Sequence, residues 1–228
     1  MNEIEKELWA KVDLYLRWAR FIPFLRMVAI CNNLSFGKVN KESDIDLFVV
    51  ARRGHLFTVR ILLTIFFQVM GVRRHGEKEA GRFCLSFFID DTVLDFKQIA
   101  IEDDFYLSLW LTNLKPVIDD GVSADFLAAN HWVWSHFDQQ TSVDVSRKKW
   151  RPVDIFTWLF PSFFEQWMKH WQLKRARQKA RSAGPESSLV VTPHMLKFHN
   201  IDRRAYYRDR WKERFGQKKL DLQDFFSF

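Results

Sequence analysis

Cysteine is scarce in this chain of 228 residues, which contains only Cys31 and Cys84, each in an apolar run. Two cysteines are too few for a multi-cysteine zinc site, and their apolar surroundings favour small buried side chains over a disulfide or a reactive thiol. Long apolar runs are also missing. The longest nearly uncharged run, residues 61–72, is far shorter than the roughly 20 residues that span a bilayer. There is no internal repeat and no low-complexity tract.

The composition is that of a soluble globular protein with ample material for a core. Hydrophobic residues make up 47% of the chain and charged residues 28%, and the length suits one large domain or two small ones. The net charge of +7 predicts affinity for anions such as nucleotides, nucleic acid or an acidic membrane face. Residues 1–9 are charged and acidic where a secretory signal would be basic and then apolar. We therefore expect a cytoplasmic protein.

Two carboxylates stand in an otherwise apolar run that ends at residue 50. Asp44 and Asp46 are two positions apart, so in a strand they project to the same face while Ile45 points to the other. Asp is disfavoured in strands and is rarely buried without a partner. Because the two anions repel each other, a divalent cation between them is one explanation, and Mg²⁺ prefers such ligands. The other is an edge strand whose polar face meets water.

The segment before the two carboxylates gives them a family context. A polar connection containing Gly37 separates the apolar run 27–31 from the acidic strand. In this order the chain resembles the nucleotidyltransferase superfamily of the polymerase-β type, including the small bacterial enzymes related to kanamycin nucleotidyltransferase. That family's pattern is Gly-Ser, a glycine a few residues on, and Ser-Asp-Ile-Asp-Leu. Residues 43–47 match it outright, beginning with Ser43, and Gly37 falls on the second glycine.

Asn32 and Asn33 replace the Gly-Ser pair, which in the family holds the phosphates of the nucleotide. Asn tolerates the left-handed backbone that such a turn needs, and its side-chain amide can donate a hydrogen bond to a phosphate. The substitution is therefore compatible with phosphate binding.

A two-metal site needs a third carboxylate on a neighbouring strand, and the resemblance places the family's third acid on a later strand. We expect strands at residues 83–89 and 93–101, joined by a hairpin turn at residues 90–92. Asp95, between two apolar residues of the second strand, is the predicted third ligand, and Asp91 is the alternative. Lys97 would share the face of Asp95, where it would reach the triphosphate or pair with an acid.

The expected fold class is α+β: a small mixed β-sheet nucleotidyltransferase core with flanking helices, followed by a mainly α-helical C-terminal region. We place the first part at residues 1–120 and the second at residues 121–228. Further expected helices span residues 3–20, 55–70, 103–114, 123–137, 153–181 and 202–215, and further strands span residues 26–31 and 115–119. Residues 139–147 are expected to be a linker, residues 187–197 an extended segment or a short turn, and the tail after 215 loosely structured.

Two basic segments each admit two interpretations. Residues 73–82 are either a solvated turn or a mobile phosphate-binding lid, because Arg matches phosphate geometry. Residues 153–181 combine an aromatic stripe with a cationic end. The stripe is typical of a core helix with cations at its C-terminus, or of a helix that binds a membrane surface or nucleic acid. Pro161 is expected to kink or split this helix.

The resemblance implies an Mg²⁺-dependent nucleotidyltransferase that moves a nucleotidyl group from a nucleoside triphosphate, with ATP expected, to a hydroxyl. The acceptor is left open among a small molecule, a protein side chain and an RNA end. Alternatives are a catalytically inactive protein of this fold that binds nucleotide or nucleic acid, and a peripheral membrane protein attached through residues 153–181. The expected metal ligands and catalytic residues are Asp44, Asp46 and Asp95. The expected nucleotide-binding residues are Asn32, Asn33, Gly37, Ser43 and Lys97.

Overall fold

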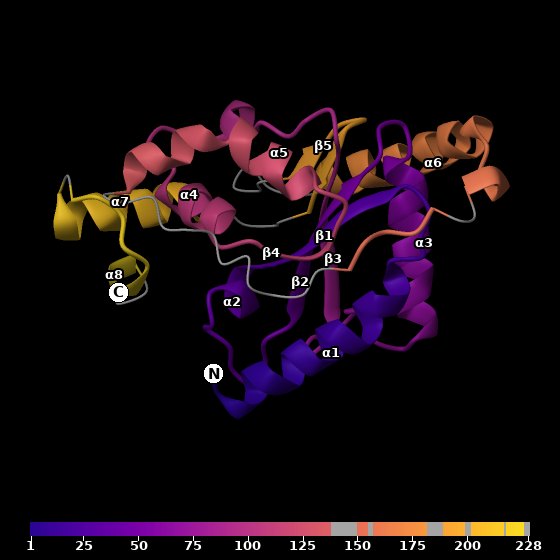
Figure 1. Ribbon diagram of the computed structural model, residues 1–228. Coiled ribbons are helices and arrows are strands. Elements are labelled where there is room, and N and C mark those ends of the chain that lie inside the picture. The colour runs from indigo at the N-terminus through magenta and orange to yellow at the C-terminus, as the bar shows by residue number, and fades with distance from the viewer. Residues whose placement is uncertain (138–149, 155–156, 182–188, 199–201, 217, 226–228) are drawn as a thin grey trace.

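A computed structural model describes residues 1–137, 150–154, 157–181, 189–198, 202–216 and 218–225 (Figure 1). These residues form eight α-helices and a six-stranded mixed sheet, so the chain is an α+β protein. The helices are α1 (Glu3–Ala19), α2 (Asn32–Ser35), α3 (Leu56–Val69), α4 (Phe105–Thr112), α5 (Val122–Ala129), α6 (Ser162–Arg181), α7 (Arg204–Phe215) and α8 (Leu222–Phe225). The short 3₁₀ helices are η1 (Phe96–Ile99), η2 (His131–His136) and η3 (Thr157–Leu159).

The sheet has the strand order β4-β1-β2-β3-β6-β5. Strands β2 and β3 are parallel, and every other neighbouring pair is antiparallel. The strands are β1 (Leu25–Cys31), β2 (Ile45–Ala51), β3 (Phe83–Asp90), β4 (Lys115–Asp119), β5 (Val190–Val191) and β6 (Met195–Lys197). Strands from both sides of residue 120 therefore contribute to one sheet.

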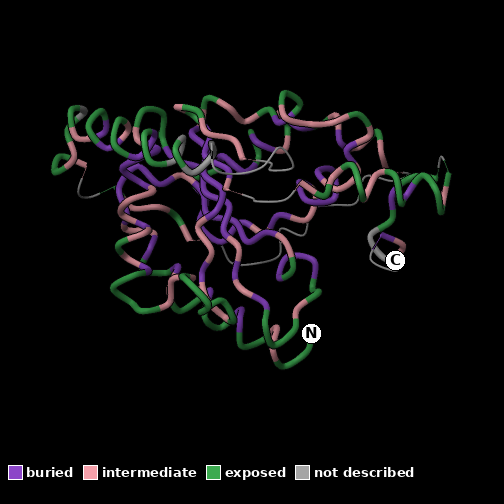
Figure 2. Tube along the Cα trace, turned by 180° about the vertical axis from the view of Figure 1, so that it is seen from behind, coloured by how far each residue is buried: buried purple, intermediate pink, exposed green. Residues whose placement is uncertain are grey.

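The three central strands read as nearly continuous apolar runs because both faces of the sheet are covered. One face packs against α1, α3 and α6, and the other packs against α4, α5 and η1. Figure 1 shows α1 and α3 on one side of the strands and α4 and α7 on the other. The buried residues are concentrated in the centre of the molecule, and the exposed residues lie at its periphery, as Figure 2 shows.

Aromatic rings fill the core between the sheet and α4. The ring of Phe48, on β2, lies 5.1 Å from those of Phe87 and Trp110, centroid to centroid, with edge-to-face geometry. Phe96 of η1 packs on the same group, at 5.5 Å from Phe87. Such contacts add to the free energy of burying large rings, so much of the unusual aromatic content serves packing.

Most expected elements are present within a few residues. The helix expected at residues 123–137 instead divides into α5, which ends at Ala129, and η2, and three other expectations are wrong. The hairpin at residues 90–92 and the strand at residues 93–101 do not form: β3 leads through a turn into η1. The Asp95 side chain accepts a hydrogen bond from the Lys97 amide and so caps this 3₁₀ helix. In the tail, Leu220 and Phe225 are buried against Trp211, so this part is packed and not loose.

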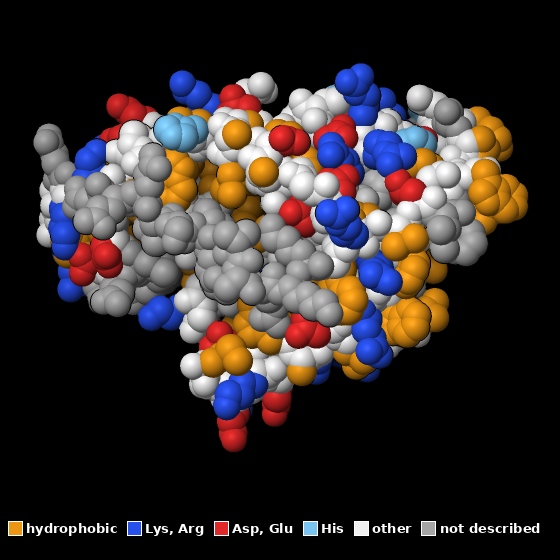
Figure 3. Space-filling view, in the orientation of Figure 1, with side chains coloured by type: hydrophobic (Ala, Val, Ile, Leu, Met, Phe, Trp, Pro, Cys, Tyr) orange, Lys and Arg blue, Asp and Glu red, His pale blue; other side chains and the backbone are white. Residues whose placement is uncertain are grey.

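The helix expected at residues 153–181 is divided at Pro161, as its proline predicted, with the short η3 before it and α6 after it. The interpretation of its aromatic stripe as core is only partly right, because Phe164 packs on the core while Trp167 is 63% exposed. Hydrophobic side chains gather at the surface where η3 and α6 begin (Figure 3). The expected linker at residues 139–147 lies outside the described residues. Within the described part of the chain, no helix is long and apolar enough to cross a membrane.

The buried face of α6 carries a carboxylate that caps another helix. Helix α3 begins without a side-chain cap from its own N-cap residue, His55. Glu165, which is 4% exposed, accepts hydrogen bonds from the amides of Phe57 (3.0 Å) and Thr58 (2.7 Å) and from the Thr58 hydroxyl (2.6 Å). It thereby satisfies amide groups that a helix N-terminus leaves unpaired, and its charge suits the helix dipole.

We predict that Glu165→Ala lowers the free energy of unfolding by about 2–4 kcal/mol, because it leaves buried donors without acceptors. Urea denaturation followed by circular dichroism would measure the change. Gln166→Ala, at the exposed neighbouring position, is the matched control and should change stability by less than about 0.5 kcal/mol. Equal effects of the two substitutions would contradict this role for Glu165.

Candidate active site

Asp44 and Asp46 lie at the start of β2, on the face of the sheet that is covered by α4. Both are partly buried, and the Asn32 side-chain amide donates to Asp46 Oδ2 at 2.9 Å. Burial, followed by the charge of Asp44, raises the pKa of Asp46 to about 6. Burial also raises the pKa of Asp44, against the opposing charge of Arg74. The two predicted carboxylates are therefore close enough to interact and are held where their ionisation is disfavoured.

The connection before β2 positions one of the predicted phosphate-binding residues at these carboxylates. Asn32 has a left-handed backbone, with φ of 55°, as its asparagine identity allows. Asn33 and Gly37 are exposed, and neither lines the cavity described below. The Ser43 hydroxyl is hydrogen-bonded within its own loop, where it accepts from the Asn40 amide at 2.9 Å. Of these four residues, only Asn32 reaches the carboxylates.

Cys84 takes the place beside Asp46 where a third carboxylate was expected. Parallel pairing of β2 with β3 sets Asp46 opposite Cys84, and one ligand atom from each of Asp44, Asp46 and Cys84 lies within 4.8 Å of the others. Burial, followed by the charge of Asp46, raises the pKa of Cys84 to about 12, so its thiol is neutral. The sequence predicted Cys84 only as a small buried side chain and did not predict that it lies next to Asp44 and Asp46. Local sequence does not identify the strand that pairs with β2.

Arg74 supplies positive charge at this cluster. Its Nη1 lies 2.7 Å from Asp44 Oδ2, and its Nη2 lies 2.6 Å from Glu79 Oε1. Nη1 also approaches the Cys84 sulfur at 3.7 Å. Arg74 belongs to the basic loop at residues 73–82, so at least this side chain of the loop is not simply solvated.

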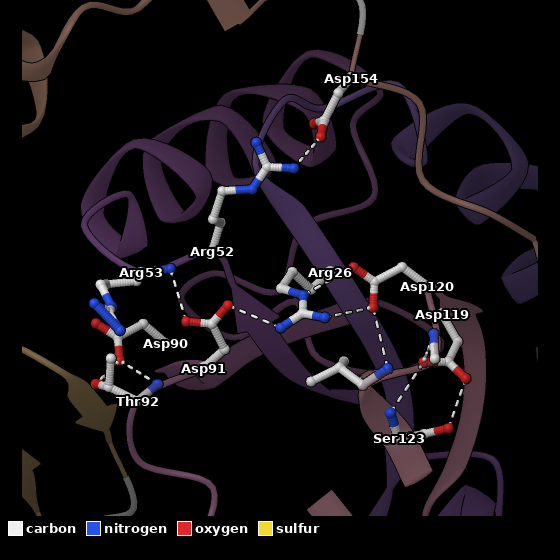
Figure 4. Close-up of polar contacts among 12 residues, drawn as sticks. Arg26, Arg52, Arg53, Asp90, Asp91, Thr92, Asp119, Asp120, Ser123 and Asp154 are labelled. Carbon is white, nitrogen blue, oxygen red and sulfur yellow. Dashed lines mark hydrogen bonds and ion pairs between the residues drawn. The ribbon is translucent and has the colours of Figure 1, made fainter. Parts of the chain in front are cut away.

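The structure does not bring Asp95 or Lys97 to this cluster. Asp95 is an exposed cap of η1, Lys97 is exposed, and neither lines the cavity next to Asp46. Asp91, the alternative third ligand, lies beyond the other end of β3. There it accepts from Arg26 Nη1 at 2.9 Å and from the Arg53 amide at 2.9 Å (Figure 4). Asp91 is thus engaged in a separate network of ion pairs.

Asp46 and Asn32 open into a cavity of about 680 Å³, which we call the carboxylate cavity. Its opposite wall comes from α4, β6 and the start of α7. The rings of Tyr106 and Tyr207 are stacked there, 5.1 Å apart. Lys197 is buried, and burial, followed by the charge of Arg204, lowers the pKa of its amine to about 8. Sequence reasoning missed these residues because they come from segments 60 and more positions away from Asp46.

The donor set fits one divalent cation and does not fit two. Two carboxylate oxygens suit a hard ion such as Mg²⁺, which keeps positions for phosphate oxygens. The neutral sulfur of Cys84 is a soft donor and a poor ligand for Mg²⁺. A second Mg²⁺ would need a further carboxylate, and among the described residues the only such ligand group includes Asp44, Asp46 and Cys84 alone.

The fold and the site together define an α+β protein with two neighbouring carboxylates, one of which lines a cavity with aromatic and cationic residues. Comparison of the chain with models of known protein families, with curated proteins and with solved structures finds no match in any of the three.

The raised pKa of Asp46 predicts a specific dependence of stability on pH in metal-free buffer. The folded state binds this proton more tightly than the unfolded chain, whose carboxyl has a pKa near 4. Proton binding by Asp46 therefore stabilises the folded state. This stabilisation is fully present below about pH 4 and is lost as pH rises through about 6. Asp46→Asn should remove this loss and stabilise the protein by about 1–3 kcal/mol at pH 7.5, with little effect at pH 4.

Urea denaturation in EDTA at several pH values would measure this difference. Asp125→Asn, at an exposed position on α5, is the matched control and should show no such trend. A constant difference between Asp46→Asn and the wild type from pH 4 to 7.5 would contradict the prediction.

Proposed function

We propose that this protein is a nucleotidyltransferase that binds a nucleoside triphosphate, with ATP expected, in the carboxylate cavity. It would transfer the nucleotidyl group to a hydroxyl and release pyrophosphate. The observation that carries the proposal is the proximity of Asp44 and Asp46, of which Asp46 lines a cavity that also carries stacked tyrosine rings and the cations Lys197 and Arg204. Carboxylates suit the metal of a metal-triphosphate complex, aromatic faces suit a base, and cations suit phosphates.

Each side chain has a distinct part in this proposal. Asp44 and Asp46 would hold one divalent cation, Mg²⁺, which when bound would neutralise charge on the phosphate oxygens. Asn32 already donates to Asp46 and would keep that carboxylate oriented. Lys197 would accept the proton of the attacking hydroxyl, because an amine with a pKa of about 8 can be neutral near physiological pH.

Nucleotidyl transfer can be tested without knowing the acceptor. We expect a cell extract supplied with the protein and with a nucleoside triphosphate labelled in the α-phosphate to acquire label in protein, RNA or a small molecule. The Asp44→Asn/Asp46→Asn variant should lose at least about 100-fold of this transfer, since metal stabilisation of the transition state is worth several kcal/mol. Asp125→Asn should retain it. Equal labelling by the carboxylate variant and the wild type would exclude this site.

The second candidate function is binding of a nucleotide or nucleic acid without transfer. Two observations favour it: Cys84 stands beside Asp46 where a third carboxylate would complete a two-metal site, and Arg74 pairs with Asp44. Calorimetric titration with Mg²⁺ and ATP separates the two candidates when it is combined with the labelling experiment. Metal-dependent binding with no transfer, even by the wild type, would support this second candidate. An affinity that is the same with and without Mg²⁺ and falls steeply with salt concentration would indicate binding to a basic surface instead.

Cys84 provides a gain-of-function prediction. Cys84→Asp places a third carboxylate opposite Asp46, which should raise the affinity for Mg²⁺ or Mn²⁺ by about tenfold or more because hard cations prefer carboxylate oxygen to sulfur. Calorimetry with the metal alone would measure it. Asp125→Asn, at the exposed position on α5, should leave the affinity unchanged. If Cys84→Asp binds metal no better than the wild type, Cys84 does not face the metal position.

A further inference from the structure

A second cavity, of about 610 Å³, lies between α3, α6 and the start of β3. We call it the arginine cavity because its wall carries four arginines, together with His75. No aspartate or glutamate is among the described residues that line it. The arginines come from α3, the basic loop and α6, and are Arg60, Arg73, Arg74 and Arg175.

Arg60 is the deepest of these cations, and it has no carboxylate partner among the described residues. Its Nη1 donates to the Gln172 side-chain carbonyl, and its guanidinium lies 4.8 Å from the centre of the Phe198 ring. Its Nε is buried with no hydrogen-bond partner. Burial, followed by the charges of Arg73 and Arg175, lowers the pKa of Arg60 to about 10. A buried cation surrounded by other cations is costly unless an anion joins them.

Two other partly buried arginines of this protein are paired with acids. Arg204 contacts the buried Asp104 at 3.0 Å and Asp202 at 2.6 Å. Arg26 lies between Asp91 and Asp120, at 2.9 and 2.8 Å. The surroundings of Arg60, where the neighbouring charges are those of Arg73 and Arg175, therefore differ from those of Arg26 and Arg204.

The two cavities meet at the edge of β3. Strand β6 pairs only with positions 87–89 of β3, and the Phe198 amide adds one hydrogen bond to the Ser86 carbonyl. The beginning of β3 is thus free of β6, and Arg74, Cys84, Ser86 and Phe198 line both cavities. A bound group in the arginine cavity would lie within reach of Arg74, which also contacts Asp44.

We propose that the arginine cavity binds a phosphate group. Arginine forks match the geometry of phosphate oxygens and form charge-assisted hydrogen bonds with them. The phosphate could come from the bound nucleoside triphosphate or from a phosphorylated second substrate. Phosphate binding itself is independent of the transfer reaction, whereas the assignment of this phosphate to a substrate rests on the proposed function.

Tripolyphosphate, titrated in EDTA by calorimetry, is the probe. We expect the wild type to bind it and Arg60→Gln and Arg175→Gln each to weaken the affinity at least tenfold. Arg175 is exposed, so its substitution should not disturb folding, and circular dichroism would confirm this for both variants. Arg17→Gln, on the exposed face of α1, is the matched control. No binding by the wild type, or equal affinity in all variants, would overturn the proposal.

Two further titrations distinguish the sources of the phosphate and separate this proposal from the transferase. If saturating Mg²⁺ and ATP compete with tripolyphosphate, the cavity holds phosphates of the nucleotide; if both bind together, it holds those of a second substrate. The Asp44→Asn/Asp46→Asn variant should bind tripolyphosphate in EDTA at least as well as the wild type. Tripolyphosphate binding in a protein that shows no labelled transfer would remove the proposed reaction but leave the phosphate site.

Discussion

The repulsion between two carboxylates at the start of β2 is the constraint on which the site depends. Asp46 is held between Cys31 and Cys84 by the pairing of β2 with β1 and β3, and Asp44 comes directly before this strand. Two neighbouring side chains reduce the free-energy cost of holding these negative charges close together. Asn32 donates a hydrogen bond to Asp46, and Arg74 forms an ion pair with Asp44. Asp46 still has a raised pKa, so the compensation is incomplete and a further positive charge would be favourable there.

Sequence patterns predicted the parts of the fold that are decided locally. Apolar runs identified β1 to β3, helical spacing identified α1, and an apolar run ended by Gly71 identified α3. The left-handed backbone of Asn32 is one that its asparagine identity tolerates. Asp95 shows the limit of local patterns: an acid between two apolar residues fits a strand, but it also fits the cap of a 3₁₀ helix whose next residue, Phe96, is buried. The partner of β3 on its open side is β6, more than 100 residues later, and no local pattern predicts that contact.

Helix α6 shows why a hydrophobic stripe can mislead. Its aromatic residues suggested the buried face, yet the side chains that dock it on α3 include Glu165 and Gln172. The reason is the start of α3, whose free amides and carbonyl require polar partners in a buried place. Glu165 accepts from two of those amides, and Gln172 donates to the Phe57 carbonyl at 3.0 Å. The need to satisfy buried backbone groups therefore outweighs the burial of large rings, and Trp167 is left exposed.

The position of Arg74 connects the two cavities through charge. Arg74 lines both cavities, and its guanidinium pairs with Asp44 beside the carboxylate cavity. In the arginine cavity, no aspartate or glutamate is among the described lining residues. A cation at Asp44 and Asp46 would repel this guanidinium, whereas a phosphate near Arg60 would attract it. Both effects act in the same direction, away from Asp44. Metal binding in one cavity and phosphate binding in the other should therefore favour each other, because each ligand reduces the cost of moving the same side chain.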